Sequence, residues 1–477
     1  MPLDDLCAAL VAILGEGRVR RDAATLASVA EDFTENPPGA PSLVVSATTV
    51  EEVRAVVRAC RERRVPLVPR VAATNVGGLT NPAAGAVVLD LTRMDRIVEV
   101  NEADLYAVIE PGVTWEGLKA FLDGRGLDLV VGYPLSPPDS SVLANCVLDG
   151  LGNLSLRYGS MAEWITGLEV VLPDGSLART GSAAAGLSWC SRGPFPDVTG
   201  LFVCFQGTTG VVTKMGLALW PRPRHRRRLF VLCYDRGAAI AAMRELSRAR
   251  LADDLGGLSW PTGKMLLGVP RPGPRDPDEP DFFLYVDVSG YSAAELELRV
   301  GLLGEILGRL RAEGHELEDP ISVPELVAIE PKMSKFADFP TRLDFLLDYP
   351  GGGLTWVGTY GPLSRLDDGW GAGEAALAHA GFPPVLVSRP MKGGHFAVLR
   401  FIINFDKRDA DEVARVRAAN RSLLEAVLPL GFLPYKTPGW AVEMLRDRLD
   451  PGFLRLVHDV KRMLDPDGLM NPGRWAV

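Results

Sequence analysis

The sequence predicts an α+β fold with more than one domain. The chain has 477 residues, a length at which about two or three domains are expected. From about residue 41 to 222, strand-like and helix-like segments alternate between glycine-rich turns. From about 223 to 430, two modules of strand followed by helix predict an antiparallel sheet covered by helices.

Residues 1–40 are interpreted as a short amphipathic helix and a connector that pack on the first domain. Leu6, Leu10 and Leu14 repeat at helical spacing. The segment carries acidic residues where a signal peptide needs a basic region. No apolar run reaches the roughly 18 residues of a membrane-spanning helix. These features predict a cytoplasmic protein with no membrane partner.

The first domain is expected to begin with a strand, a helix, a second strand and a loop. Leu43–Val45 has the composition of a strand, and Thr49 and Glu52 are spaced as a capping box. The helix that follows has apolar residues at helical spacing, namely Val53, Val56, Val57 and Cys60. The second strand, Pro66–Val68, leads into the loop.

That loop, within VPLVPRVAATNVGG at 65–78, organises the domain, and its complement is FQGTTGVVTKM at 205–215. Its small residues continue to Gly77 and Gly78, where a backbone could lie flat against a ligand. Such a loop can turn several N–H groups toward a diphosphate. It is neither a Walker loop nor a GxGxxG turn that opens a helix, and an ordinary turn is the alternative.

Four further motifs follow in order: PGVTW at 111–115, GLEVVLPDG at 167–175, GTTGVVTKMGLALWP at 207–221 and LDPDGLMNPGRW at 464–475. As an ordered set they resemble the vanillyl-alcohol oxidase and p-cresol methylhydroxylase (PCMH) superfamily. The resemblance implies a PCMH-type two-part FAD-binding domain at 41–222 and a substrate-binding cap domain at 223–430. It also implies that the C-terminal segment, 431–477, returns to the FAD domain.

The resemblance implies which residues hold FAD. The first loop binds the diphosphate through backbone amides, and Gly207, Gly210 and Val212 lie against the adenine end. The expected cofactor contacts are Pro69, Arg70, Val71, Ala72, Ala73, Thr74, Asn75, Pro134, Ser140, Ser141, Leu143, Asn145, Gly150, Gly207, Gly210, Val212, Lys436 and Asn471. The loop has no His at 71–74, and Leu354 stands where a cap His would bond the flavin, so non-covalent FAD is predicted.

Flavin catalysis needs an oriented donor, a proton acceptor and charge near flavin N1. Tyr435 and Lys436 occupy the place of a Tyr–Arg pair in phenol-oxidising relatives, and an exposed turn is the alternative. His395 could transfer a proton or satisfy a buried carbonyl. Asp139 could act as a base or only cap a turn.

Charge and cysteine content disfavour several other classes. The net charge is −9 with a pI near 5.3, and there is no basic stripe with interleaved aromatics, so no nucleic-acid partner is expected. The HRRR run at 225–228 is interpreted as a solvated linker, with contact to an anionic cofactor or partner as the alternative. The six cysteines lack CxxC spacing and the histidines lack ligand pairing, so no metal is predicted.

These patterns predict an FAD-dependent oxidoreductase. It would take a hydride from an alcohol, a hydroxy acid or an aromatic C–H donor to flavin N5, with oxygen or a redox partner as acceptor. Arg389, Lys392 and Arg400 could clamp a carboxylate or be solvated surface charges. The partner is a small-molecule substrate, and family analogy allows a homodimer. A non-redox transferase of the alkyl-glycerone-phosphate synthase type and an inactive flavin-fold binding protein are the alternatives.

Overall fold

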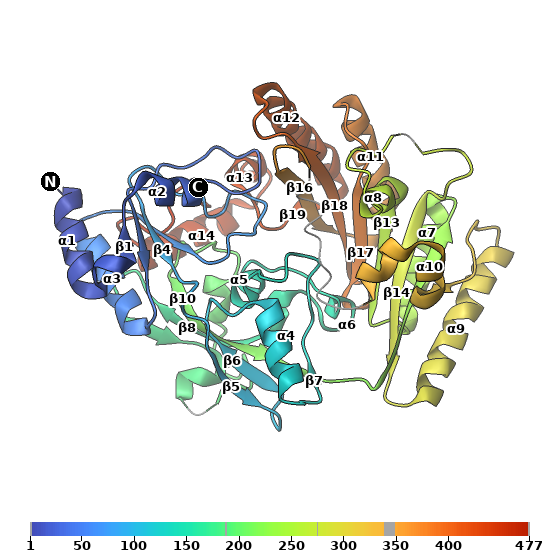
Figure 1. Cartoon of the computed structure of the whole chain (residues 1–477), viewed down its shortest axis with the longest axis horizontal. Coiled ribbons are helices and arrows are strands. Elements are labelled where there is room, and N and C mark those ends of the chain that lie inside the picture. Colours follow the sequence, from blue (N-terminus) through green and yellow to red (C-terminus); the bar gives the residue numbers. More distant parts are fainter. Residues whose placement is uncertain (1, 187, 274, 338–348, 476–477) are drawn as a thin grey trace.

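The computed structural model describes residues 2–186, 188–273, 275–337 and 349–475. Its described strands form a four-stranded, a five-stranded, a two-stranded and an eight-stranded sheet. Figure 1 shows the smaller sheets on the left and the eight-stranded sheet with its helices on the right. The predicted α+β class is therefore confirmed.

The four-stranded sheet carries the first predicted strands. Its order is β1 (Val19–Arg20), β2 (Leu43–Ser46), β4 (Val87–Asp90) and β3 (Leu67–Arg70), and β2, β4 and β3 are parallel. The helices with it are α1 (Pro2–Leu14), α2 (Ala23–Ala30) and α3 (Val50–Glu62). Leu6, Leu10 and Leu14 of α1 are buried in the same core as the apolar side of α3, as their spacing predicts.

The predicted capping box at the start of α3 forms in part. Thr49 Oγ1 accepts a hydrogen bond from the backbone N–H of Glu52 at 3.2 Å. The Glu52 carboxylate, however, accepts from the backbone N–H of Thr48 at 2.8 Å and pairs with Arg18. The reciprocal bond is therefore displaced by one residue, because Arg18 draws the carboxylate toward itself.

The five-stranded sheet contains two of the sequence motifs. Its order is β5 (Ile97–Asn101), β6 (Tyr106–Ile109), β10 (Val211–Ala218), β8 (Ile165–Val171) and β9 (Leu177–Arg179). Every residue of β8, which comes from GLEVV, is buried. The associated helices and the small sheet are α4 (Trp115–Gly124), α5 (Val142–Val147), α6 (Ser155–Tyr158), β7 (Leu129–Val130) and β11 (Trp220–Pro221).

The eight-stranded sheet is antiparallel throughout its described strands, as predicted for the cap. Its order is β15 (Ile321–Ser322), β12 (His225–Cys233), β14 (Phe282–Gly290), β13 (Asp254–Ser259), β17 (Leu386–Met391), β18 (Phe396–Phe405), β16 (Gly353–Gly361) and β19 (Leu433–Pro434). One face packs on α7 (Arg236–Ala249), α9 (Ala293–Ala312), α11 (Leu366–His379) and α12 (Ala410–Val427). The other face packs on α8 (Trp260–Leu266), α10 (Val323–Ile329) and Leu135 of the first domain.

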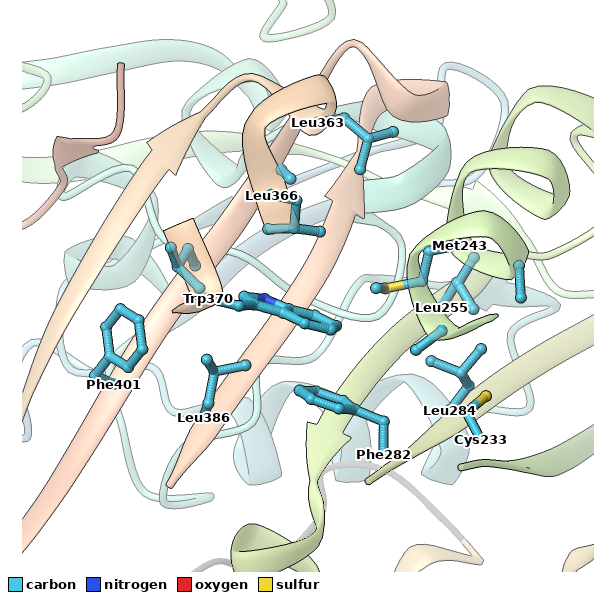
Figure 2. Close-up of a cluster of buried hydrophobic side chains, with 14 of the residues drawn as sticks. Cys233, Met243, Leu255, Phe282, Leu284, Leu363, Leu366, Trp370, Leu386 and Phe401 are labelled. Carbon is cyan, nitrogen blue, oxygen red and sulfur yellow. The ribbon is translucent and has the colours of Figure 1, made fainter. Parts of the chain in front are cut away.

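The helix-covered face has a dense aromatic core. Trp370 of α11 stacks on Phe282 of β14, with ring centroids 4.0 Å apart and planes 1° from parallel. Figure 2 shows this stack between Leu386 and Phe401 on one side and the Met243 and Leu255 side chains on the other. Burial of these large side chains is the dominant stabilising term for the cap.

The HRRR run does not form a solvated linker, so that interpretation is wrong. His225–Arg228 begins strand β12 and pairs with β14. Arg228 is buried, and its Nε and Nη2 donate to the two oxygens of Asp287 at 2.7 and 2.6 Å. A charged residue enters a sheet core here because its partner lies directly opposite on β14.

The C-terminal segment runs back to the four-stranded sheet. It contains α13 (Gly439–Leu445) and α14 (Pro451–Leu464), and Figure 1 places both, and the C-terminus, beside the N-terminal elements. The backbone N–H of Asn471 donates to the Leu67 carbonyl at 2.8 Å, so the segment lies along β3. Within the described part of the chain, no helix pairs the length with the apolar content that a bilayer crossing demands.

Candidate functional site

A cavity of about 1090 Å³, including the space at its mouth, opens where four segments meet. The segments are the loop after β3, the stretch from 136 to 148 that enters α5, the stretch from 202 to 212 that enters β10, and the C-terminal segment. The residues that line it are Pro69, Val71, Ala72, Ala73, Thr74, Asn75, Leu79, Thr80, Leu91, Pro111, Ser136, Ser141, Leu143, Ala144, Asn145, Val147, Leu148, Phe202, Gln206, Gly207, Thr209, Gly210, Val212, Trp356, Lys436 and Asn471.

The first loop presents its backbone to this cavity. No described residue accepts a hydrogen bond from the backbone N–H groups of Ala72, Ala73 or Thr74. Ala73 has a φ of 54°, and successive amides in such a conformation can converge on an anion. Asn75 Oδ1 accepts from the backbone N–H groups of Gly77 and Leu79, at 3.2 and 3.1 Å, and this fixes the end of the loop.

The loop at 206–210 needs its glycines. Gly207 has a φ of 76°, and a Cβ there would lie 2.9 Å from the ring of Pro69. Gly210 has a φ of 157°, and a Cβ there would lie 2.7 Å from Val170. The first approach seats this loop against Pro69 at the start of the first loop and the second seats it against β8, and no larger residue allows them.

Two buried amide oxygens at the cavity have no protein partner among the described residues. They are Gln206 Oε1 and Asn471 Oδ1. Asn471 Nδ2 donates to the carbonyls of Gln206 and Leu79, at 2.7 and 3.2 Å, so the side chain clamps both loops while its oxygen remains unpaired. A ligand with hydroxyl or N–H donors would satisfy these oxygens.

The third side of the cavity is the start of α5. Ser141 caps this helix, because its Oγ accepts from the backbone N–H of Ala144 at 3.1 Å. Ser140 is buried behind the loops, and Thr74 Oγ1 donates to its Oγ at 2.9 Å. Asn145 is the second polar residue of this side that reaches the cavity, and its Oδ1 accepts from Lys436 Nζ at 3.2 Å.

Lys436 is the only ionisable residue among the described residues that line the cavity. Burial, together with the nearby Arg400 guanidinium, lowers the pKa of its ammonium to about 8. Its φ of 50° lies in the left-handed region, which a non-glycine residue rarely adopts. A buried cation with a depressed pKa at a cavity is a mark of a functional site.

The cap approaches the cavity through Trp356 of β16. The guanidinium carbon of Arg400 lies 4.7 Å from the centre of the Trp356 ring system. Arg400 also donates to the hydroxyl of Tyr435, and Tyr435 stacks on Tyr360 with centroids 4.6 Å apart. Tyr435 therefore lies under the cap sheet, directly before Lys436 in sequence.

The structure brings most of the predicted cofactor contacts to this cavity. The predicted residues that line it are Pro69, Val71, Ala72, Ala73, Thr74, Asn75, Ser141, Leu143, Asn145, Gly207, Gly210, Val212, Lys436 and Asn471. Pro134, Ser140 and Gly150 are buried nearby in the first domain but are not lining residues. Arg70 is turned toward α2, where its Nη1 donates to the Val29 carbonyl at 3.2 Å.

Two of the predicted catalytic residues lie apart from the cavity. His395 is exposed and borders a separate depression with Lys392, Ser247 and Arg250. Asp139 is exposed on the turn before Ser140. Their positions give neither residue a contact with the cavity, so neither is retained in the function proposed below.

Some lining residues were not predicted, and Gln206 is one of them that carries a sequence signal. Gln206 directly precedes the GTTG motif, and its Nε2 donates to the Thr437 carbonyl at 2.7 Å. Trp356 lies in a β-rich run, but nothing in that run shows which face meets the cavity. Groups of His, Cys, Asp or Glu that could hold a metal are absent from the described residues.

Comparisons with known proteins agree with this geometry. Residues 41–181 match the FAD binding domain model, and residues 222–475 match the model of the FAD linked oxidases, C-terminal domain. The chain is 28% identical to 1'-carboxy-chondrochloren decarboxylase of Chondromyces crocatus, over 99% of this chain and 97% of that protein. It is 25% identical to the mitochondrial D-lactate dehydrogenase [cytochrome] of Arabidopsis thaliana, over 91% of this chain and 73% of that protein.

Solved structures show the same fold. Substrate-bound p-cresol methylhydroxylase superposes with a TM-score of 0.87 at 23% identity, covering 100% of this chain and 97% of the other. An alkyldihydroxyacetonephosphate synthase superposes with a TM-score of 0.73 at 15% identity, covering 98% and 85%. The resemblance inferred from the motifs is confirmed, and the chain belongs to the FAD-linked oxidases with a PCMH-type FAD-binding domain.

Proposed function

We propose that this FAD-linked oxidoreductase takes a hydride from a small-molecule donor that binds between the cavity and the cap sheet. The observation that carries the proposal is the make-up of the cavity. Its loops present unpaired backbone N–H groups, and its opposite side reaches the cap at Trp356 and Lys436. An alcohol, a hydroxy acid or an aromatic C–H donor can react in such a site.

The residues present fit FAD. Bound FAD would supply the hydride acceptor, flavin N5. The free N–H groups of 72–74 suit its diphosphate, and Gln206 Oε1 and Asn471 Oδ1 can accept hydrogen bonds from its hydroxyl groups. The resemblance assigns Gly207, Gly210 and Val212 to the adenine end.

Oxidation of an alcohol or a hydroxy acid requires loss of a hydroxyl proton as well as a hydride. Lys436 can take that proton in its neutral form, whose population rises as the pH passes through its pKa of about 8. The resulting ammonium would remain beside Asn145 Oδ1 and place a positive charge next to the negative charge that hydride transfer adds to the site. Proton acceptance and charge stabilisation would thus come from one side chain.

Non-covalent binding predicts that acid precipitation of the purified protein releases its yellow colour into the supernatant. The reason is that the described lining residues include no His, Cys or Tyr that could bond the flavin ring. The measurement is the visible spectrum of supernatant and pellet after precipitation. Colour that stays in the pellet would contradict the prediction and would indicate a covalent bond.

Anaerobic mixing of the FAD-loaded protein with candidate donors tests the function. D-lactate and p-cresol, the compounds in the names of its relatives, are the first donors to try, and loss of visible flavin absorbance is the expected result. Product formation without any flavin reduction would support the transferase alternative instead. A protein that binds no FAD, or that no donor bleaches, would support the inactive binding protein. Oxygen or a redox partner as the electron acceptor, and a homodimeric state, stay predictions.

Oxidative decarboxylation is a second candidate function, favoured by the absence of His and carboxylate groups from the described cavity lining. In such a reaction a hydride leaves the carbon next to the one that bears the carboxylate, and the C–CO₂ bond supplies the electron pair of a new C=C bond. CO₂ is released and no proton acceptor is needed. The relative from Chondromyces crocatus is a decarboxylase by name. Release of one CO₂ per flavin reduced would support this candidate.

A further inference from the structure

One face of the cap sheet packs on α7, α9, α11 and α12. The opposite face, which packs on α8 and α10, carries buried polar residues at alternate positions. Arg389 of β17 and Arg400 of β18 both point to this face, since their strand neighbours Leu386, Leu399 and Phe401 lie in the helix-covered core. Val398, the register partner of Arg389, lies two residues from Arg400, so the two arginines are diagonal neighbours on adjacent strands.

Two glycines allow tyrosine rings to lie across the sheet toward these arginines. A Cβ at Gly256 of β13 would lie 2.3 Å from the Tyr285 hydroxyl, so the Tyr285 ring crosses from β14 over β13. A Cβ at Gly358 of β16 would lie 2.7 Å from Tyr435 Cε1, so the Tyr435 ring lies over β16. The two tyrosines therefore approach the arginine pair from opposite sides.

The distances agree with this convergence. The Arg389 guanidinium carbon is 5.9 Å from the centre of the Tyr285 ring. The Arg400 guanidinium carbon is 5.8 Å from the centre of the Tyr435 ring, and Arg400 donates to the Tyr435 hydroxyl. We call these four side chains, Tyr285, Arg389, Arg400 and Tyr435, the cap cluster.

The cap cluster has buried donors that no described residue satisfies. They are Tyr285 Oη, Arg389 Nε and Nη1, and Arg400 Nε. Arg389 is 2% exposed, Tyr285 6% and Arg400 9%. Burying hydrogen-bond donors without acceptors costs free energy of folding, unless a bound ligand accepts their hydrogen bonds.

The cap cluster also carries uncompensated positive charge. Arg389 pairs with Asp254 and donates to the Gly152 carbonyl at 2.9 Å, so its charge is balanced. Arg400 has no carboxylate partner among the described residues and is held by the Trp356 ring and the Tyr435 hydroxyl. Within the cap cluster one positive charge is therefore unpaired, and a negative group from outside the protein would balance it.

The cap cluster borders the cavity. Trp356, which lies under Arg400, lines the cavity, and so does Lys436, the residue after Tyr435. The four side chains of the cap cluster are not lining residues themselves, so a donor bound between cavity and cap would reach them past Trp356 and Lys436.

We propose that the cap cluster is a subsite for a carboxylate group of the donor. The inference rests on the proposed function and names its substrate class. A carboxylate has two oxygens and one negative charge, which match donors on three strands and the one unpaired charge within the cap cluster. A phenolate offers only one oxygen to the same donors.

Titration of the FAD-loaded protein with benzoate and phenylacetate, and with their neutral amides, tests the subsite. Calorimetry and the shift of the flavin spectrum report binding without turnover. At least one carboxylate is expected to bind at least tenfold more tightly than its amide. Arg400→Met is expected to weaken that carboxylate at least tenfold, with Arg400→Lys in between, because a lysine keeps the charge and loses the fork. p-Cresol in the same titration shows whether the subsite binds a phenol rather than a carboxylate.

Tyr285→Phe is a second variant that tests the subsite if Arg400→Met does not fold. Because the Tyr285 hydroxyl has no partner, its removal is expected to leave the melting temperature unchanged or raised while carboxylate affinity falls several-fold. Arg365→Met is the matched control, since Arg365 is half exposed, pairs with Asp368 and is expected to bind the probes as wild type does.

Three results would overturn the subsite: no carboxylate binds, carboxylate and amide bind alike, or Arg400→Met and Arg365→Met bind alike. Each of these leaves the function proposed above standing if the protein holds FAD and a donor bleaches it. A protein that takes up no FAD would instead refute the proposed function before any probe is added.

Discussion

Replacing Lys436 by methionine is expected to slow flavin reduction by an alcohol or hydroxy acid by about 10²–10⁴-fold. The variant loses both the proton acceptor and the charge that would remain beside Asn145. In the wild type, the rate of flavin reduction is expected to rise with pH and level off above about 8, the pKa of this side chain. Stopped-flow measurement of flavin absorbance across this pH range checks both statements.

Lys436→Arg separates the two roles. Arginine stays charged at every accessible pH and cannot accept the proton, so the variant is expected to be slow with a flat pH profile. A variant that keeps the wild-type rate would show that only the charge matters, or that loss of CO₂ replaces loss of a proton. His395→Gln is the control, because the exposed imidazole lies outside the cavity and its loss is expected to leave the rate unchanged.

The same methionine variant is expected to stabilise the apoprotein at pH 7 by about 1–3 kcal/mol. Burial lowers the pKa of Lys436 from 10.5 to about 8, so the unfolded chain binds more protons between these values. The wild type therefore gains stability as the pH rises through this window, and the variant does not. Thermal unfolding at several pH values measures the difference. A gain in stability with a loss of rate is the signature of a functional residue.

Replacing Asp287 by asparagine is expected to destabilise the cap by about 3–5 kcal/mol. Arg228 and Asp287 have side chains only 5% and 3% exposed, and the change removes the carboxylate that pairs with the buried guanidinium. Denaturant unfolding followed by far-UV circular dichroism measures the loss. The exposed pair of Arg365 and Asp368 supplies the control, since Asp368→Asn should change stability by no more than about 0.5 kcal/mol.

The Asp287 effect is expected to depend on pH. Burial acts to raise the pKa of Asp287, but the ion pairs with Arg228 and Arg226 outweigh it and hold the pKa below its ordinary value. The stabilisation is therefore complete above the unfolded pKa of about 3.9 and is lost as the pH falls through the folded pKa. The double change Arg228→Met with Asp287→Met should cost less than Asp287→Asn alone, because it removes both charges. A larger cost for the double change would contradict this account.

The FAD-binding half was more predictable than the cap. Its loops can be recognised from short runs of sequence, because glycines such as Gly207 and Gly210 stand where the chain passes too close to Pro69 and Val170 for a Cβ. The strands and helices around 43–70 likewise follow from capping and spacing. His395 and Asp139 show the limit of this reasoning, since residue type suggested chemistry while position on the surface decided against it.

The sequence by itself determined the family, the α+β class and most of the cofactor loops, because each depends on contiguous residues whose backbone requirements are local. Only the tertiary structure decided what the cap contributes. Arg228 became a core residue because β14 places Asp287 opposite it, and Arg389, Arg400 and Tyr285 met Tyr435, which follows β19, because the strands of one sheet align in a particular register. Register joins residues more than a hundred positions apart, and it is set by the packing of the whole sheet rather than by any one segment.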